Sequence, residues 1–455
     1  MDDPDALCDR GIALNNAGRY AEAAACLIRA LELRPGFIDA RFNLGTSYAA
    51  LRRTDEALAC FRAVLERAPR SADTHSNIGA VLQERGELDA AVASYRRALE
   101  IRPDLVEALN NLGTLLEQRN RRREAMALYS RALAADPASA RAAYNLGLAH
   151  LREREFEAGW RYCEARFHTA PPVTPPRQFP FPELSASELG RAHRIAIWPE
   201  QGIGDQVLYS TLLPELEARG ERFVVQVDPR LAPAYRRTHP RWNVVAEPDF
   251  GGCDRHIAIG SLPRLLRADK ASFSRQPRAL FAAAPRPGLP KPLIGISWRS
   301  FQPSLSRYQQ GKKSGPLTMF MPLSRLPGVR LLDLQYGDTA TERAAFAAAG
   351  GELVHLPDLD LFHDLDGVLA AIQACDLVVT TSNVTAHFAG ALGKETLLVY
   401  PGGDSPFYYW VPDENGRCLW YPSVKIVTGR ELDTWDKVTA RVSSETQASL
   451  DVNKS

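Results

Sequence analysis

The most regular feature of the chain is a pattern of small and apolar residues that repeats every 34 positions over its first third. The repeated positions are Gly45, Gly79, Gly113 and Gly147, Pro35, Pro69, Pro103 and Pro137, Ala57, Ala91 and Ala125, and Leu31, Leu65, Leu99 and Leu133. Gly11 extends the glycine series backwards, and large apolar side chains keep the same period at Leu27, Phe61, Tyr95 and Tyr129. Each period predicts a pair of helices: the second ends at the proline, and the small residues mark where the two helices approach closely.

A 34-residue period of this content is the signature of the tetratricopeptide repeat (TPR), a helix pair that buries its apolar face only by stacking on its neighbours. We expect five such units over residues 1–168, stacked into an α-helical superhelix. The fifth unit departs from the pattern in its second half, EFEAGWRYCEARF, where Trp160 and Phe167 enlarge its apolar face. Terminal repeats are atypical because they cap the stack or dock on a neighbour. We expect this unit to dock.

The rest of the chain has a different pattern, in which short apolar runs alternate with helical segments. After a proline-rich linker over residues 169–190, the expected strands are RIAIW, FVVQVDP and RHIAIG. A second proline-rich link, at 284–292, precedes PLIGISW, VRLLDLQ, ELVHL, CDLVVTT and ETLLVYP. Strands that alternate with helices form parallel sheets. The sequence therefore predicts two Rossmann-like α/β domains that face each other, at 191–286 and 287–432. A C-terminal helix or tail over 433–455 is expected to cross back to the first of them.

Composition narrows the classes of function without selecting one. The 455 residues are too many for a single core, and the net charge of +1 gives no overall field that favours nucleic acid or a membrane surface. The seven cysteines are scattered, without the spacing of metal ligands, which favours reduced thiols. The N-terminal residues MDDPDALCDR lack the apolar core of a signal peptide, and no run approaches the roughly 20 apolar residues that span a bilayer. We expect a cytoplasmic protein.

The first candidate for chemistry is the turn that contains Gly202, Gly204 and Asp205, between the strand RIAIW and the helix after it. Glycines at such a turn let a ligand approach the backbone, and a helix N-terminus favours negative charge. The turn therefore predicts a phosphate site, although the full dinucleotide motif GxGxxG is absent. The structural alternative is that Asp205 only caps the helix.

The second candidate is the segment with Ser382, Asn383, Thr385 and His387, which follows the buried strand DLVVTT and opens a helix. Ligands of open parallel sheets bind beyond the carboxyl ends of the strands, and helix N-termini bind anions. The alternative is an ordinary N-cap at Ser382 or Asn383, with His387 hydrogen-bonded inside the fold.

Two further segments are weaker candidates. Ser297 and Arg299 lie at another strand end, and the loop after them carries Arg307, Lys312 and Lys313, whose charges could neutralise a diphosphate or simply be solvated. Asp404 lies in PGGDSPFYYW, a turn whose aromatic residues could stack on a base or sugar ring or close the core.

Taken in order, these segments resemble bacterial TPR proteins that carry a C-terminal glycosyltransferase module related to the heptosyltransferases. The resemblance rests on EAGWRYCEARF, IWPEQGIGDQVLYSTLLPEL, IGISW, KSGPLTMFMPLSRLPGVRLLDLQYGD, DLVVTTSNVTAHFAGALGKETLLVYPGGDSP and WYPSVKIV. It implies a GT-B fold, in which the C-terminal domain holds a nucleotide-sugar donor and the N-terminal domain presents the acceptor. Similar TPR glycosyltransferases modify flagellin.

The resemblance also implies roles for individual residues. Asp205 matches the acidic residue proposed as general base, which takes the proton of an attacking hydroxyl. The residues expected on the donor side are Gly202, Gly204, Ser297, Arg299, Lys312, Ser382, Asn383, Thr385, His387 and Asp404. No Asp-x-Asp motif is placed to hold a metal, so we expect a metal-independent reaction with the nucleotide sugar as co-substrate and no further cofactor. Heptosyltransferase-type relatives usually have an acidic residue where Ser382 stands, which indicates a sugar other than heptose.

The repeats carry a second resemblance, to the asparagine ladder with which the eukaryotic O-GlcNAc transferase grips a peptide main chain. The matching residues are Asn43, Asn77, Asn111 and Asn145, each two positions before a repeat glycine. A carboxamide offers both a donor and an acceptor to a backbone amide. The alternative is that asparagine is merely common at this position of the repeat.

Together these features predict a glycosyltransferase that moves a sugar from a nucleotide-sugar to Ser or Thr hydroxyls of a polypeptide held by the TPR groove, with flagellin as the first candidate acceptor. Two alternatives remain open. One is a TPR scaffold whose second half has lost catalysis, and the other is a transferase that acts on a glycan or lipid.

Overall fold

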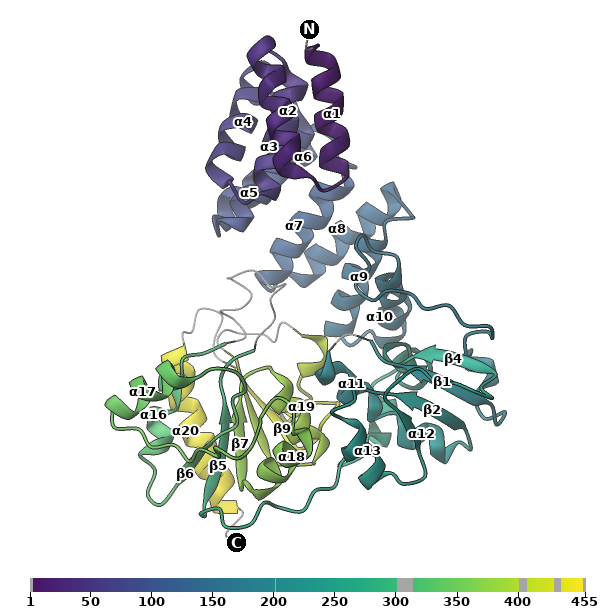
Figure 1. Ribbon diagram of the computed structural model, residues 1–455, viewed down its shortest axis with the longest axis vertical. Helices are drawn as coiled ribbons and strands as arrows, with labels where there is room; N and C mark the ends of the chain where they lie inside the picture. The colour runs from purple at the N-terminus through teal and green to yellow at the C-terminus, as the bar shows by residue number, and fades with distance from the viewer. Residues whose placement is uncertain (1–2, 201, 301–313, 401–406, 429–434, 453–455) are drawn as a thin grey trace. The chain divides into compact units, whose positions relative to one another are not determined.

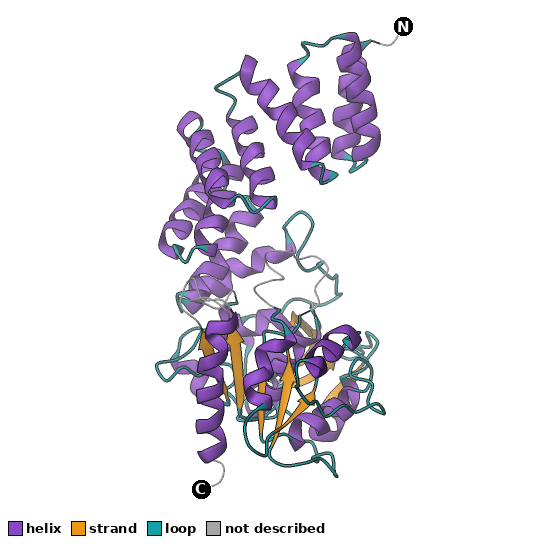
Figure 2. Cartoon of the chain, turned by 90° about the vertical axis from the view of Figure 1, so that its left-hand side faces the viewer, coloured by secondary structure: helices purple, strands orange, loops and turns teal. Residues whose placement is uncertain are grey.

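The structure is a computed structural model that describes residues 3–200, 202–300, 314–400, 407–428 and 435–452 (Figures 1 and 2). Its internal contacts divide the chain into two compact units, Met1–Ala149 and His150–Ser455. The division falls within the fifth repeat unit, between Ala149 and His150, whereas the expected domain boundary lay after that unit, at residue 168.

The first unit is a superhelix of paired helices. Its helices are α1 (Pro4–Asn16), α2 (Tyr20–Leu33), α3 (Ile38–Ala50), α4 (Thr54–Arg67), α5 (Ala72–Glu84), α6 (Leu88–Ile101), α7 (Val106–Gln118), α8 (Arg122–Ala135) and α9 (Ala140–Arg152), the last of which runs into the second unit. Each repeat proline lies two residues beyond the end of a second helix, as the sequence predicts.

The periodic glycines allow the two helices of each pair to touch. A Cβ added at Gly45 would lie 2.7 Å from Cε1 of Phe61, and one added at Gly113 would lie 2.5 Å from Cε1 of Tyr129. The same relation joins Gly11 to Leu27 and Gly79 to Tyr95. Since real Cβ atoms do not approach other atoms so closely, any larger residue would push the helices apart. The expected close approach at these positions is confirmed.

A second 34-residue series lies in the turn between the two helices of each repeat. Its members all have a positive φ: 73° at Gly18, 60° at Arg52, 80° at Gly86, 60° at Asn120 and 65° at Arg154. Glycine and asparagine adopt this left-handed conformation at little cost, whereas an arginine is strained in it. Because the residue type changes from repeat to repeat, the series does not stand out in the sequence.

The second unit begins within the fifth repeat, whose second helix α10 (Phe156–Cys163) continues into a 3₁₀ turn at Glu164–Phe167. The α10 side chains pack on the α/β part that follows. The indole Nε1 of Trp160 donates to the carbonyl of Arg267 at 2.7 Å, and the rings of Phe156 and Phe273 lie 4.9 Å apart. Trp160 and Phe156 are both buried.

The first sheet contains four parallel strands in the order β3-β2-β1-β4 (Figure 1). The strands are β1 (Arg194–Trp198), β2 (Arg222–Gln226), β3 (Asn243–Val245) and β4 (Arg255–Ala258), and the helices are α11 (Ile203–Ser210), α12 (Leu213–Ala218), α13 (Ala232–Thr238) and α14 (Leu262–Leu266). The linker before β1 adds an isolated parallel bridge, Glu183 to His256, at the β4 edge.

The second sheet contains five parallel strands in the order β6-β5-β7-β8-β9. The strands are β5 (Leu293–Ser297), β6 (Arg330–Asp333), β7 (Leu377–Thr380), β8 (Thr396–Tyr400) and β9 (Val424–Thr428), and the helices are α16 (Met321–Ser324), α17 (Ala340–Ala348), α18 (Leu365–Ala374), α19 (Val384–Ala391) and α20 (Trp435–Val452). The expected strand in ELVHL is wrong, because this segment forms only an isolated bridge from Leu332 to Val354.

The C-terminal helix α20 packs on the second sheet, against β7, β8 and β9 (Figure 1). Val442 is 3% exposed and belongs to the core around β5, and Glu445 forms an ion pair with Lys425 of β9 at 2.6 Å. The expectation that the tail crosses back to the first sheet is therefore wrong. Over the residues described, no helix is both long and apolar enough to span a membrane.

Candidate functional site

Each sheet of the second unit has one position where the direction of winding reverses. In the first sheet, β1 has β2 on one side and β4 on the other; in the second sheet, β5 has β6 on one side and β7 on the other. The crevice at the carboxyl ends of such strands is where open parallel sheets bind ligands. Asp205 follows β1, Ser297 ends β5 and Asn383 follows β7. The sequence candidates therefore lie at the two switch points.

Asp205 lies in the first turn of α11 rather than at its cap. The N-cap is Gly202, with φ −84° and ψ 173°, and among the described residues no side chain forms a capping hydrogen bond to this helix, so the alternative that Asp205 caps it is wrong. Asp205 is half-buried. Burial raises the pKa of four nearby tyrosines well above the usual value, and the carboxylate of Asp205 raises each further; they are Tyr209, Tyr408, Tyr409 and Tyr421. The carboxylate thus lies near these tyrosines, of which Tyr209 and Tyr421 are buried and Tyr408 and Tyr409 are half-buried.

Asn383 is the N-cap of α19. Its Oδ1 accepts hydrogen bonds from the backbone N–H groups of Thr385 at 3.0 Å and Ala386 at 3.4 Å. Its Nδ2 donates to Oγ of Ser297 at 2.8 Å, across the switch point from β7 to β5. This is the ordinary N-cap that was the structural alternative for the segment. Both ends of the carboxamide are therefore engaged within the fold.

Gln335, just after β6, completes the network at this edge. Its Oε1 accepts hydrogen bonds from Oγ of Ser297 at 3.0 Å and from the backbone N–H of Arg299 at 2.7 Å. The backbone N–H of Gln335 is in turn bonded to the carboxylate of Asp333 at 2.9 Å, and burial raises the pKa of this carboxyl. Sequence reasoning missed Gln335; the only signal was a polar residue directly after the apolar run of VRLLDLQ.

His387 lies in an aromatic pocket and is 5% exposed. Its Nδ1 is hydrogen-bonded to the hydroxyl of Tyr421 at 3.2 Å, and its ring centroid is 4.8 Å from that of Trp410. The indole N–H of Trp410 donates to Oγ of Ser382 at 3.0 Å. His387 is thus hydrogen-bonded inside the fold, which agrees with the structural alternative.

The first turns of α11 and α19 meet, which joins the two candidate segments. A Cβ added at Gly204 would lie 2.8 Å from Cδ2 of His387. The structure therefore brings together Gly202, Gly204 and Asp205 with Ser382, Asn383, Thr385 and His387, and Ser297 joins them through Asn383.

The remaining candidate residues are not shown to join this cluster. The guanidinium of Arg299 donates to the carbonyl of Asp338 at 2.6 Å and lies 3.4 Å from the carboxylate of Glu342, so its charge is already engaged. Lys312 and Asp404 lie outside the described residues, as do Arg307 and Lys313.

A buried ion pair, missed in the sequence, lies at the switch point of the first sheet. Arg166 donates from Nε to Oε1 of Glu200 at 2.8 Å, and from Nη1 to the carboxylate of Glu164 at 2.7 Å. Oε2 of Glu200 accepts the backbone N–H of Gly260, just after β4, at 2.7 Å. Burial opposes the charge of Arg166, but the two carboxylates more than offset it and hold its pKa above the usual value. The only signals were Glu164 and Arg166 in the segment EARF and Glu200 in the segment WPEQ.

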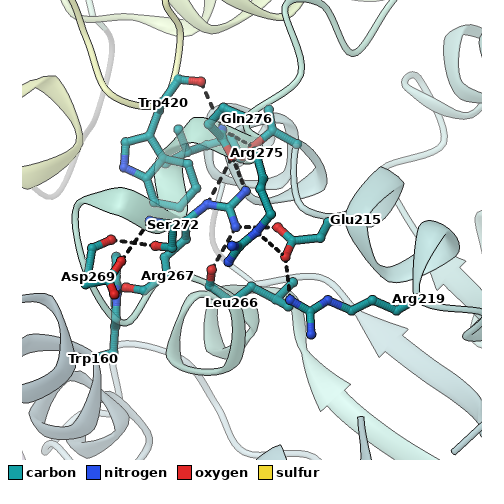
Figure 3. Close-up of polar contacts among 12 residues, drawn as sticks. Trp160, Glu215, Arg219, Leu266, Arg267, Asp269, Ser272, Arg275, Gln276 and Trp420 are labelled. Carbon is teal, nitrogen blue, oxygen red and sulfur yellow. Dashed lines mark hydrogen bonds and ion pairs between the residues drawn. The ribbon is translucent and has the colours of Figure 1, made fainter. Parts of the chain in front are cut away.

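A second buried network joins α10 to both sheets (Figure 3). Arg267 is fully buried and contacts the carboxylate of Glu215 at 2.5 Å and Oε1 of Gln276. The amide of Gln276 donates to the carbonyl of Trp420 at 3.0 Å, while Trp160 donates to the carbonyl of Arg267. The fifth repeat, the first sheet and the segment before β9 are therefore held together by one set of hydrogen bonds.

In the first unit, the four asparagines of the expected ladder are all partly buried on the first helices of their repeats. Nδ2 of Asn43 donates to the carbonyl of Asp39 at 2.9 Å. Asn111 is placed differently, since it lines a groove of about 750 Å³ that also includes its neighbour Asn110. The groove is bounded by the starts of α5, α7 and α9 and by the loops before α7 and α9.

Comparison with known proteins identifies tetratricopeptide repeats and one similar curated protein. Residues 8–59, 37–104 and 70–138 match models of the tetratricopeptide repeat. Over 316 residues the chain is 32% identical to protein FlbA of Caulobacter vibrioides, an alignment that covers 63% of this chain and 51% of that protein. The chain thus spans about half the length of the curated relative that it matches.

Similar solved structures include TTC0263, a thermophilic TPR protein of Thermus thermophilus, at 19% identity and a TM-score of 0.34, covering 37% of this chain and 92% of that one. Pseudomonas aeruginosa pilF is 18% identical with a TM-score of 0.36, covering 52% of this chain and 92% of that one. The chain therefore carries an N-terminal superhelix of tetratricopeptide repeats, followed by a region of parallel sheets, and is similar to FlbA.

Proposed function

We propose that the second unit is a glycosyltransferase module of the GT-B type. In this proposal the module moves a sugar from a nucleotide-sugar donor to Ser or Thr hydroxyls of a polypeptide that the repeats hold. Flagellin is the first candidate for that polypeptide.

One observation carries the proposal: the helices that follow the switch-point strands of two separate parallel sheets meet at their first turns. Gly204 of α11 lies against His387 of α19. Helix N-termini and switch-point crevices both favour phosphate groups, and two such ends at one place suit a ligand with a diphosphate.

Asp205 is the proposed general base. It lies in the first turn of α11, half-buried near four tyrosines, from where a carboxylate could take the proton of an attacking hydroxyl. The leaving diphosphate would be stabilised from the α19 side. Since Asn383 already occupies the N–H groups of Thr385 and Ala386, the phosphate would replace this cap or bind beside it.

In this proposal the repeats bind the acceptor polypeptide. Asn43, Asn77, Asn111 and Asn145 would hydrogen-bond a peptide main chain, which provides affinity with little sequence selectivity. A captured acceptor is present at a high effective concentration, so a slow transfer site can still modify it.

The first test is a thermal-shift panel of nucleotides and nucleotide sugars on the full chain. A donor present well above its dissociation constant stabilises the folded state by mass action and raises the melting temperature. The panel member with the largest shift is then used with an unmodified polypeptide in a mass-spectrometric transfer assay. The proposal is abandoned if no member of the panel shifts the melting temperature.

Matched variants separate catalysis from binding. Asp205→Asn keeps the size of the side chain but removes the base, so transfer should fall about 10²- to 10⁴-fold while the donor-induced shift persists. Glu157→Gln, an exposed carboxyl in the first turn of α10, is the control and should transfer normally. Equal transfer rates in the two variants would exclude Asp205 as the base.

The second candidate is a scaffold without catalysis. The observation that favours it is the closed network at β5 and β7, where Asn383, Ser297 and Gln335 satisfy one another. A scaffold would bind polypeptides through the repeats but show no donor-induced shift. A transferase for glycans or lipids would show the shift, and would modify a glycolipid but no polypeptide.

A further inference from the structure

Asn110 is an unusual residue at its position in the repeat. The equivalent positions 34 residues before and after it are Ser76 and Tyr144, so the asparagine is not a repeated feature. Its side chain is 3% exposed and lines the groove between the starts of α7 and α9. Within the described part of the chain, its buried Oδ1 has no hydrogen-bond partner. A buried acceptor without a donor costs stability, so a donor from outside would be favoured once the side-chain amide turns this oxygen toward the groove.

The charges around the groove indicate which donor fits. The lining side chains include four carboxylates, of Asp73, Asp104, Glu107 and Asp136, and two guanidinium groups, of Arg102 and Arg141, which leaves two net negative charges. Asp73 and Arg102 neutralise each other in an ion pair. The other three carboxylates face a single cation, Arg141. The groove therefore attracts a positively charged group that also donates hydrogen bonds.

We propose that this groove binds a lysine or arginine side chain of a partner polypeptide. The cationic head donates to Oδ1 of Asn110, and its charge is balanced by Asp104, Glu107 and Asp136. The neighbouring Asn111, which also lines the groove, would bond the main chain of the same segment. The inference rests on the proposal that the superhelix holds a polypeptide, but it does not depend on sugar transfer. It adds side-chain selectivity to a ladder that recognises only the main chain.

The test uses the full chain and four fluorescein-labelled 12-residue peptides, measured by fluorescence anisotropy. The peptides share a Gly/Ser host sequence and differ at one central residue, which is Arg, Lys, Gln or Glu. We expect the Arg and Lys peptides to bind at least tenfold more tightly than the Gln and Glu peptides. Raising the salt concentration should reduce this preference, because exposed charges are screened. Equal binding of the Gln peptide, or no binding of any of the four, would overturn the proposal.

Variants identify the groups involved. Asn110→Leu removes the acceptor and should weaken binding of the Arg peptide about tenfold. Gln118→Leu is the control: Gln118 lies on the same helix and its buried oxygen also has no partner among the described residues, but it does not line the groove, so binding should not change. If Asn110→Leu fails to fold, the exposed pair Asp104→Asn with Glu107→Gln gives the second test. This double variant should lose the preference for Arg over Gln; if it keeps the preference, the proposal is wrong.

The outcomes also separate this inference from the transferase proposal. If nucleotide sugars bind and the peptide preference is absent, only the groove inference fails. If the preference is present and no nucleotide sugar binds, only the transferase proposal fails.

Discussion

Gly204 and His387 lie in contact at the first turns of α11 and α19, and the space between them admits no Cβ. A Cβ at Gly204 would be 2.8 Å from Cδ2 and 3.2 Å from Nε2 of the imidazole. His387 has little freedom to withdraw, because it is buried between Trp410 and the hydroxyl of Tyr421. The contact between α11 and α19 at this point therefore depends on the absence of a side chain at Gly204.

We expect Gly204→Ala to destabilise the second unit by about 1–3 kcal/mol, the usual cost of overpacking. The measurement is urea unfolding followed by tryptophan fluorescence. Gly202→Ala is the control, because its nearest neighbour is 4.0 Å away and its φ is −84°. Combining Gly204→Ala with His387→Ala should cost less than the sum of the two single changes, since the clash disappears. Additive effects would show that the two residues are not coupled.

The ion pair between Arg166 and Glu200 provides the second prediction. Glu200→Ala removes one of the carboxylates that pair with the buried guanidinium of Arg166. The free energy of unfolding should therefore fall by about 3–5 kcal/mol. The double change Arg166→Met with Glu200→Leu removes both charges of this pair. It should lower the free energy of unfolding much less than Glu200→Ala does, because apolar pairs of similar size often replace buried ion pairs without loss of stability. Chemical unfolding of both variants decides the matter. A double variant less stable than Glu200→Ala would contradict this account.

The repeat glycines provide a third prediction, confined to the first unit. Gly113→Ala places a methyl group 2.5 Å from the ring of Tyr129 and should lower the melting temperature of the repeats by several degrees. Gly36→Ala, where no atom lies within 4 Å of the added carbon, should be neutral or slightly stabilising, since alanine restricts the unfolded chain. Circular dichroism at 222 nm reports the loss of helix. Similar melting curves for the two variants would refute the close-packing role of Gly113.

The helical half of the fold could be predicted well from the sequence because each 34-residue unit repeats the same contacts. The close contact between Gly45 and Phe61 is repeated in each of the equivalent pairs. The left-handed turn was missed because Arg52 and Asn120 occupy positions where Gly18 and Gly86 give the usual signal. The strands were predicted less well. β3 has only three residues, and β9 has Lys425 as its second residue, so neither stands out as an apolar run.

The candidate site could be predicted only in part. Strand ends are visible in a sequence, which is why Asp205, Ser297 and Asn383 were found. Their partners are not visible, because pairing depends on how distant segments pack. The contact of Gly204 with His387 and the ion pair of Arg166 with Glu200 each join segments far apart in the chain, and neither has a local signal.

Two histidines make the second unit sensitive to mild acid. His239 stacks on Trp242 with ring centroids 3.7 Å apart and is bonded to the carbonyl of Leu280, and His256 stacks on Phe179 at 4.3 Å. Burial lowers the pKa of both below the usual 6.5. The unfolded chain therefore takes up protons at a higher pH than the folded one. The stability that their neutral forms contribute is present above pH 6.5 and is lost as the pH falls through the folded-state pKa.

We accordingly expect the melting temperature of the second unit to decline between about pH 7 and pH 5, the range over which histidine gains its proton. His256→Phe keeps an aromatic ring against Phe179 but cannot ionise, so its decline should be shallower than that of the unaltered chain. The measurement is differential scanning calorimetry in matched buffers at several pH values. His75→Gln, which lies on α5 in the first unit, should leave the transition of the second unit unchanged at every pH. If His256→Phe declines as steeply as the unaltered chain, protonation of His256 is not a source of the acid sensitivity, and His239 or the carboxyl groups must account for it instead.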